Sequence, residues 1–399
     1  MNKNINTARH LIEAEIVRIR EAIDLKCDFI DDPSFETGIL GLSLFYIFYS
    51  VFTGDTKYLD KAEELIFKAF KNSTAEKFQR TYKTDTLDNQ LAHFGRFILF
   101  SKENNLIAFE VDEYLLDLDS ILFDLMKSKV EVGNFDYQSG ALAAGFYLIG
   151  RVDQVDGIRE KLAYLLFQIK EKSISDPDGS IYWTLPALHD RVYLGISHGS
   201  ALIMSFICNV MELQIEVDTC AEILRKASNF LIKQEADFGK GLFPHYLNDN
   251  EPGPKQFSLC YGDLGIGYAL LRTGTLLGDK NFEEIADRIL LDCLNRKKED
   301  NLTFDASITY GAAGLATTFE KIFKYKNDEQ YLKASHYWYE KIVEYSTYSN
   351  KYAGYKSRVS DENGFGNLGF SWGIAGIGAA LMHSLNQELP DISSLMLIA

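Results

Sequence analysis

The feature that most constrains the fold is a glycine-to-aspartate spacing that occurs three times along the chain. In each case a glycine begins an apolar segment and an aspartate follows 17 residues later. The three pairs are Gly38 and Asp55, Gly262 and Asp279, and Gly311 and Asp328. A carboxylate at a helix start accepts hydrogen bonds from free backbone N–H groups, so each aspartate is expected to cap a second helix. A Gly-led helix, a turn and an Asp-capped helix therefore form one repeated unit.

Three further apolar segments begin with glycine in the same way, which gives six visible units. They start at Gly140, Gly199 and Gly373. The interval between Gly38 and Gly140 is about twice the others, so we expect a degenerate unit near His93-Phe94-Gly95. The natural count is about seven hairpins.

The two helices of a unit differ in their apolar pattern. Residues 264–271 are apolar nearly all round, which is typical of a buried helix. Residues 58–70 carry one apolar stripe, which is typical of a helix with a solvent-facing side. Stacked hairpins bury their apolar faces against their neighbours. The sequence therefore predicts an all-α fold, an α/α toroid of about seven helical hairpins, with residues 1–399 as a single domain.

Charge and cysteine usage exclude several classes of function. The formal net charge of −16 argues against binding to nucleic acid or anionic membranes, and it is compatible with cationic peptide substrates. No apolar run approaches 18 residues, so no integral membrane segment is expected. The start of the sequence lacks the apolar region of a signal peptide. Five cysteines without a regular spacing indicate reduced thiols, and we expect a cytoplasmic protein.

Residues with chemical potential lie in the loops just before the Gly-led helices. Asp136, His198, Cys260 and Tyr310 each lie within four residues of such a glycine. In a toroid these loops converge at one end of the ring. Helix N-termini there favour negative charge and lower the pKa of a thiol. We therefore expect the active site at that end.

These loops also carry a family resemblance over nearly the whole chain. The segment from Leu194 to Gly199 resembles the His-Gly motif of the lanthionine synthetase C-like proteins, and Cys260-Tyr261-Gly262 resembles their Cys-Tyr-Gly motif. The first unit, with 38–45 and 53–59, is similar to the first repeat of that family. The resemblance implies a cyclase of lanthipeptide biosynthesis. Such enzymes add a peptide cysteine thiol to dehydroalanine or dehydrobutyrine and so close a thioether ring.

The resemblance also implies roles for individual residues. His198 matches the histidine proposed as acid and base, Asp136 the active-site aspartate, and Tyr261 the tyrosine beside the zinc-binding cysteine, so these three are the expected catalytic residues. Family members usually hold zinc with Cys, Cys and His. Cys260 matches the first ligand, but Thr309 and Tyr310 stand where the other two are expected.

The zinc site is therefore degenerate, because a catalytic zinc needs three protein ligands. We expect no metal and no cofactor, unless zinc is held by ligands from elsewhere such as Asp263. Gln256 stands where the family has a basic residue, four positions before the cysteine. Cys260, Tyr310 and Gln256 are expected to contact the substrate instead of a metal.

Three functions remain open from the sequence. The first is a thioether-forming cyclase that works without the usual zinc, with a precursor peptide as its partner. The second is a non-catalytic scaffold of the same family that binds a peptide or a lanthipeptide dehydratase. The third is a toroidal glycosidase with two carboxylates, such as Asp136 and Asp263. Each candidate also has a structural interpretation: His198 could fill space, Asp136 could cap a helix, and Cys260 and Tyr310 could pack as core residues.

Overall fold

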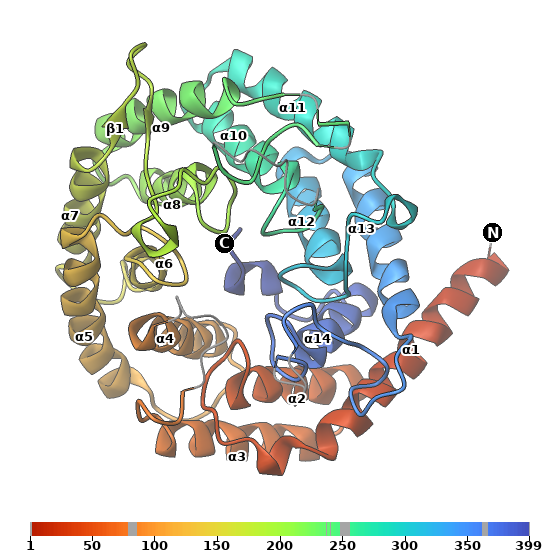
Figure 1. Ribbon diagram of the computed structural model, residues 1–399. Helices are drawn as coiled ribbons and strands as arrows, with labels where there is room; N and C mark the ends of the chain where they lie inside the picture. The colour runs from red at the N-terminus through yellow and green to blue at the C-terminus, as the bar shows by residue number, and fades with distance from the viewer. Residues whose placement is uncertain are drawn as a thin grey trace.

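The helices form a closed ring in which one set of helices lies inside another (Figure 1). This computed structural model describes residues 2–78, 86–236, 238–239, 241–247, 256–360 and 366–398. The expected α/α toroid is confirmed. Among the described residues, strands are limited to the short antiparallel pair β1 (Ile174–Ser175) and β2 (Ile181–Tyr182).

The inner helices are the apolar segments that follow a glycine, together with the helix of the degenerate unit, whose N-cap is Thr86. They are α2 (Ile39–Thr53), α4 (Leu87–Glu103), α6 (Leu142–Ile149), α8 (Ser200–Glu212), α10 (Asp263–Leu277), α12 (Ala312–Lys326) and α14 (Ile374–Leu385). In α2 every residue from Ile39 to Ser50 is buried, as the all-round apolar pattern predicts.

The outer helices are amphipathic. They are α1 (Asn2–Asp24), α3 (Lys57–Lys71), α5 (Asp112–Glu131), α7 (Ile158–Glu171), α9 (Val217–Ile232), α11 (Lys280–Leu294) and α13 (Glu329–Ile342). In α3 the residues buried against the inner ring are Ala62, Leu65, Ile66 and Ala69, which belong to the expected apolar stripe. Four short 3₁₀ helices lie between these elements and a fifth follows α14: η1 (Cys27–Phe29), η2 (Pro186–Leu188), η3 (Lys298–Asp300), η4 (Val343–Tyr345) and η5 (Ile392–Leu395).

The ring is closed by the first and last helices of the chain. Elsewhere an inner helix packs against the outer helix that follows it, as α2 does with α3, α10 with α11 and α12 with α13. The last inner helix, α14, instead packs against α1 and α2 (Figure 1). The seventh pair therefore joins the two ends of the chain and is not a hairpin.

The predicted degenerate unit near His93 exists, but no glycine begins its inner helix. His93 does not precede an inner helix: it lies in the middle of α4, which starts at Leu87. Gly95 lies in α4 as well, where a Cβ would meet the ring of Tyr147 at 2.5 Å. This glycine therefore allows close packing of helices and does not mark a helix start.

Two of the three aspartate caps are confirmed. Asp279 Oδ1 accepts hydrogen bonds from the backbone N–H groups of Asn281 (3.1 Å) and Phe282 (3.4 Å), and Asp328 accepts one from Gln330 (3.0 Å). Asp55 lies one position earlier, because Thr56 is the N-cap of α3. Its carboxylate still accepts a hydrogen bond from the N–H of Lys57.

Replacing Asp279 with alanine is expected to lower the free energy of unfolding by about 1 kcal/mol, because two N–H groups lose their acceptor. Urea denaturation measures the change. Asp55→Ala is the matched control and should cost less, since Asp55 accepts from one N–H outside the cap position. Equal losses at both positions would contradict the capping argument.

The C-terminal segment lies inside the ring (Figure 1). Arg96 of α4 donates to the backbone oxygens of Ser394 (2.7 Å) and Met396 (3.2 Å). Tyr268 of α10 donates its hydroxyl to the backbone oxygen of Ile398 at 3.4 Å. The space at the centre of the toroid is therefore partly filled by residues 392–398. No described helix is long and apolar enough to cross a membrane.

Candidate active site

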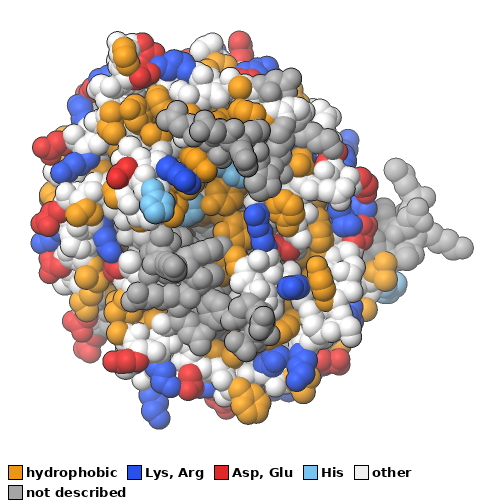
Figure 2. All heavy atoms as spheres, in the orientation of Figure 1, with side chains coloured by type: hydrophobic (Ala, Val, Ile, Leu, Met, Phe, Trp, Pro, Cys, Tyr) orange, Lys and Arg blue, Asp and Glu red, His pale blue; other side chains and the backbone are white. Residues whose placement is uncertain are grey.

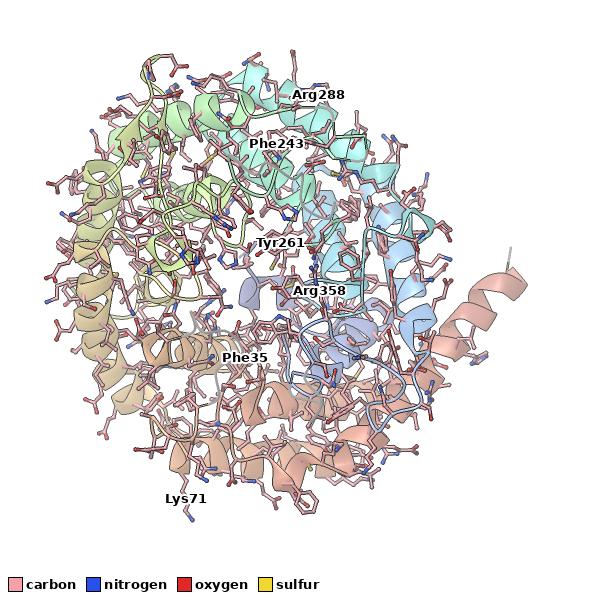
Figure 3. All side chains as sticks on the ribbon, in the orientation of Figure 1. Phe35, Lys71, Phe243, Tyr261, Arg288 and Arg358 are labelled. Atoms are coloured by element: carbon pink, nitrogen blue, oxygen red, sulfur yellow. The ribbon has the colours of Figure 1, made fainter. Side chains whose placement is uncertain are left out.

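A cavity of about 260 Å³ lies at the end of the ring where the inner helices begin. Its walls come from the loops before α2, α6, α8, α10, α12 and α14, and residues 395–397 contribute from inside the ring. Tyr261, which lines it, lies toward the middle of the ring, whereas Lys71 and Arg288 lie on the outside (Figure 3). Acidic side chains lie mainly around the rim of the molecule in the same orientation (Figure 2).

One position of the repeat recurs around this cavity. The residue two places before the inner-helix glycine lines the cavity in six loops. These six residues, which we call the girdle, are Glu36, Gln138, Ser197, Cys260, Thr309 and Ser371. Backbone hydrogen bonds join neighbouring members, from Cys260 N to Thr309 O (3.4 Å), from Thr309 N to Ser371 O (3.0 Å) and from Ser371 N to Glu36 O (3.1 Å). The repeat thus places one side chain from each loop on a common wall.

The next position in the repeat supplies larger side chains. His198, Tyr261, Tyr310 and Trp372 directly precede their glycines, and all four line the cavity. The glycine that follows Tyr261, Gly262, has a φ of +107°, which a side chain would make costly. The structure therefore brings together three of the sequence-predicted residues because they share one register position.

His198 lines the cavity and forms a close pair with Asp136, which is not itself part of the lining. His198 Nδ1 lies 2.8 Å from Asp136 Oδ1, and the aspartate side chain is 2% exposed. Burial alone would raise the pKa of the Asp136 carboxyl. The charge of His198 and the hydrogen bonds from His198 and Ser139 outweigh burial and hold this pKa below its ordinary value. Asp136 is therefore an ionised partner that orients the imidazole.

Asp136 also has a structural task, which its second oxygen performs. Ser258 and Ser307 occupy the same loop position in other units, and each hydroxyl accepts from the backbone N–H three residues on, at 3.1 and 3.2 Å. Asp136 Oδ2 does the same for Ser139 at 3.0 Å. A carboxylate at this position can cap the loop with Oδ2 and still hold His198 with Oδ1. The contacts of Asp136 therefore support both its role as a cap of the loop and its role as the partner of His198.

Cys260 lies in the cavity wall as a buried thiol, 4% exposed. Burial raises the pKa of this thiol, and the negative charges of Glu36 and Asp136 raise it further. Its backbone oxygen accepts a hydrogen bond from Ser197 Oγ at 3.1 Å. Cys260 is therefore a protonated wall residue and is poorly suited to act as a nucleophile.

Aromatic rings line the wall beside His198. The Tyr261 ring centroid is 6.0 Å from that of His198, 6.2 Å from the parallel ring of Tyr310 and 4.7 Å from the stacked ring of His245. Tyr193 meets His198 edge to face at 5.8 Å. These contacts restrict the orientation of the imidazole and give the cavity an apolar wall with hydroxyl groups on it.

The residues at the family's metal position do not fit zinc. Thr309 Oγ1 donates to the backbone oxygen of Ser371 at 2.8 Å, so this hydroxyl already bonds the neighbouring loop before α14. Tyr310 is stacked on Tyr261. Of the three residues at the metal position, Cys260 is the one with a thiol. In the described part of the chain, no group of three or more His, Cys, Asp or Glu residues could hold a metal ion. A catalytic zinc needs three such ligands.

Three residues considered from the sequence lie outside the cavity lining: Asp136, which contacts His198, and two others, Gln256 and Asp263. Gln256 is 5% exposed and donates a hydrogen bond to Ser258 Oγ at 3.0 Å. It also accepts a hydrogen bond from Arg358, so a basic side chain lies beside the position where the family has one. Asp263 is 1% exposed, accepts from the N–H groups of Leu242 and Phe243 and pairs with Arg296. Asp136 and Asp263 therefore do not face each other across this cavity, which removes the support for a glycosidase.

Sequence reasoning missed Glu36 and His245. Glu36 lines the cavity and is 5% exposed. Its place two residues before Gly38 is the signal that could have found it, because Cys260 stands at the same place before Gly262. His245 stacks on Tyr261 but comes from the segment 241–247, which carries no repeat motif.

Comparisons with known proteins agree with this architecture. The family model described as lanthionine synthetase C-like protein matches residues 30–397. The solved structure of the nisin cyclase matches 100% of this chain and 98% of its own, with a TM-score of 0.71 and 15% identity. A cellobiose 2-epimerase from Bacillus thermoamylovorans matches at a TM-score of 0.42, with 12% identity over 96% of this chain and 100% of its own. A search by sequence among curated proteins found no significant match.

Proposed function

Because the chain belongs to the lanthionine synthetase C-like family, we propose that it closes thioether rings in a peptide without the usual zinc. The substrate would carry a cysteine and a dehydroalanine or dehydrobutyrine. The observation that carries this proposal is the contact of 2.8 Å between Asp136 and His198, the histidine that lines the cavity. The resemblance of the fold to the nisin cyclase supports a peptide as substrate.

In this mechanism His198 moves one proton from sulfur to carbon. With Nδ1 held by Asp136, Nε2 takes the proton of the substrate thiol, whose ordinary pKa is about 8.5. The sulfur then attacks Cβ of the dehydro residue, the C–S bond forms and the electron pair of the C=C bond moves to the enolate. The imidazolium returns the proton to Cα. The hydrogen and the sulfur of the thiol are thereby added across the double bond.

The charges of the cavity favour a histidine as the proton carrier. Asp136 and Glu36 are both held ionised, so their negative charge stabilises an imidazolium. The same charges oppose a long-lived thiolate. We therefore expect the thiol to lose its proton directly to His198 as the C–S bond forms.

A synthetic peptide with one dehydroalanine and one cysteine tests this proposal. Ring closure consumes the thiol without changing the mass, so the product no longer gains mass on treatment with iodoacetamide. We expect the protein to raise the rate of closure above that of the peptide alone. An unchanged rate, with the peptide shown to bind, would overturn the cyclase proposal.

Purified protein is expected to hold no stoichiometric zinc. The double variant Thr309→Cys, Tyr310→His restores the family's ligand set beside Cys260, so it should gain about one zinc per chain. Adding Cys260→Ala to the double variant should abolish this zinc. Metal analysis after dialysis measures all three. About one zinc per chain in the unchanged protein, lost on Cys260→Ala, would contradict the degenerate-site interpretation.

A binding scaffold is the second candidate, and the raised pKa of the Cys260 thiol favours it. A cavity that keeps its own thiol neutral is also less favourable to a substrate thiolate. In this case the protein would bind the precursor peptide, or a lanthipeptide dehydratase in the cytoplasm, without accelerating ring closure. Isothermal titration with the dehydrated peptide, run beside the closure assay, separates the two candidates.

A further inference from the structure

Glu36 and His93 form a second histidine–carboxylate pair at the same cavity. His93 Nδ1 lies 3.2 Å from Glu36 Oε2, and both side chains are almost fully buried, 3% and 6% exposed. Among the six girdle residues, Glu36 is the one with a carboxylate. It comes from the loop before α2, whereas His93 comes from the middle of α4.

Gln138 connects this pair with the first one. Its side-chain Nε2 donates to Glu36 Oε1 at 3.0 Å, and its backbone N–H donates to Asp136 Oδ2 at 3.1 Å. Asp136 in turn holds His198 at 2.8 Å. A continuous series of polar contacts thus runs from His93 through Glu36, Gln138 and Asp136 to His198.

The buried Glu36 carboxyl stays ionised. Burial alone would raise its pKa, but the charge of His93 and hydrogen bonds from Gln138 and Ser371 outweigh burial and hold this pKa below its ordinary value. Its charge acts within the cavity, since it helps to raise the pKa of the Cys260 thiol. A buried ionised carboxylate is costly unless it is compensated, so its place in the wall indicates a task.

We infer that Glu36 is a positioning residue of the active site, which fixes the His198–Asp136 pair through Gln138 and adds a second negative charge that favours a protonated His198. The anchor acts on geometry: without it, the loop 136–139 loses its fixed side-chain contact with the loop before α2. The charge acts on protonation: Glu36 adds a second carboxylate to the surroundings of the cavity that His198 lines. Its part in ring closure rests on the proposed function, whereas its effect on His198 does not.

Several titratable or charged side chains share this cavity with His198 or contact those that do. They are Glu36, His93, Arg96, Asp136, Tyr137, Tyr193, His245, Cys260, Tyr261, Tyr310 and Arg358. The two carboxylates among them are Glu36 and Asp136. Replacing the Glu36 carboxylate with an uncharged side chain of the same shape therefore isolates the effect of its charge on His198.

The first test is NMR titration of the His198 ring, assigned by comparison with His198→Gln. In Glu36→Gln, which keeps the shape of the side chain, His198 should lose its proton at lower pH than in the unchanged protein. Glu320→Gln is the matched control: Glu320 is a buried glutamate paired with His383 at 3.1 Å, and neither residue lines the cavity. It should leave the His198 titration unchanged. An unchanged His198 titration in a folded Glu36→Gln protein would overturn the inference about charge.

The second test separates geometry from charge. Gln138→Ala keeps both carboxylates but removes the side-chain anchor, so ring closure should slow by about ten- to a hundredfold. The pH dependence of closure should keep its shape in this variant and move to lower pH in Glu36→Gln. Full activity of Gln138→Ala would overturn the anchoring role. If the unchanged protein closes no rings, the cyclase proposal fails while the NMR titration still decides the effect of Glu36.

Discussion

Replacing His198 with alanine is expected to lower the rate of ring closure by about 10²–10⁴-fold, the usual cost of losing a positioned acid and base. The reaction needs a proton to leave sulfur and to reach carbon. His198 is the histidine that lines the described cavity, and Asp136 holds its Nδ1. The alanine variant leaves Asp136 with its loop cap, so the wall should keep its shape. The assay follows loss of the free thiol from the synthetic peptide.

Two controls distinguish a chemical role from damage to the fold. His336→Ala changes an exposed histidine on the outer helix α13 and should leave the rate unchanged. Cys260→Ala removes the buried thiol, and in the zinc-free mechanism it should lower the rate far less than His198→Ala. Closure at the unchanged rate by a folded His198→Ala protein would remove His198 from the mechanism. A larger loss for Cys260→Ala than for His198→Ala would point back to a metal held by that thiol.

Most of the fold could be predicted from the sequence because the repeat has a regular apolar pattern. Each Gly-led segment is apolar all round because it touches neighbours on every side, and each Asp-led segment has a polar face because one side meets water. Both patterns are local, so they can be recognised in one segment without knowing which helix packs against it. The pairing of α14 with α1 is different, because the two helices lie at opposite ends of the chain. No local pattern specifies that contact, so the sequence does not show that the seventh pair joins the two ends of the chain.

Site residues could be predicted where they belong to a sequence motif. They could not be predicted where only their position in the repeat places them in the cavity. His198, Tyr261 and Tyr310 were found because they stand directly before a glycine. Glu36 stands in an equally regular position, but glutamate is common on protein surfaces, and its burial follows from the closed ring. Gln256 was expected at the substrate, yet its side chain contacts Arg358, which comes from a loop about a hundred residues away.

In several units a second glycine stands three residues after the leading one, as Gly314 does after Gly311 and Gly376 after Gly373, and its steric role predicts the second large effect. A Cβ on Gly314 would lie 1.8 Å from the backbone oxygen of Ile308, and the same construction at Gly376 meets the oxygen of Phe370 at 1.9 Å. The loop doubles back over the first turn of the inner helix, so no side chain fits there. Gly314→Ala is therefore expected to lower the free energy of unfolding by about 3 kcal/mol, since backbone must move to admit one methyl group.

Urea denaturation of Gly314→Ala beside Gly54→Ala separates this clash from backbone strain. Gly54 has a φ of +73° but no atom within 4 Å of its Cβ position, so its alanine variant should lose about 1 kcal/mol. The loop that Gly314 accommodates also carries Thr309 and Tyr310 into the cavity wall. Gly314→Ala should thus weaken ring closure as well as stability, whereas Gly54→Ala should leave closure intact. Equal losses of stability in the two variants would show that the glycines are needed for their φ angles and not for close packing of the loops that build the site.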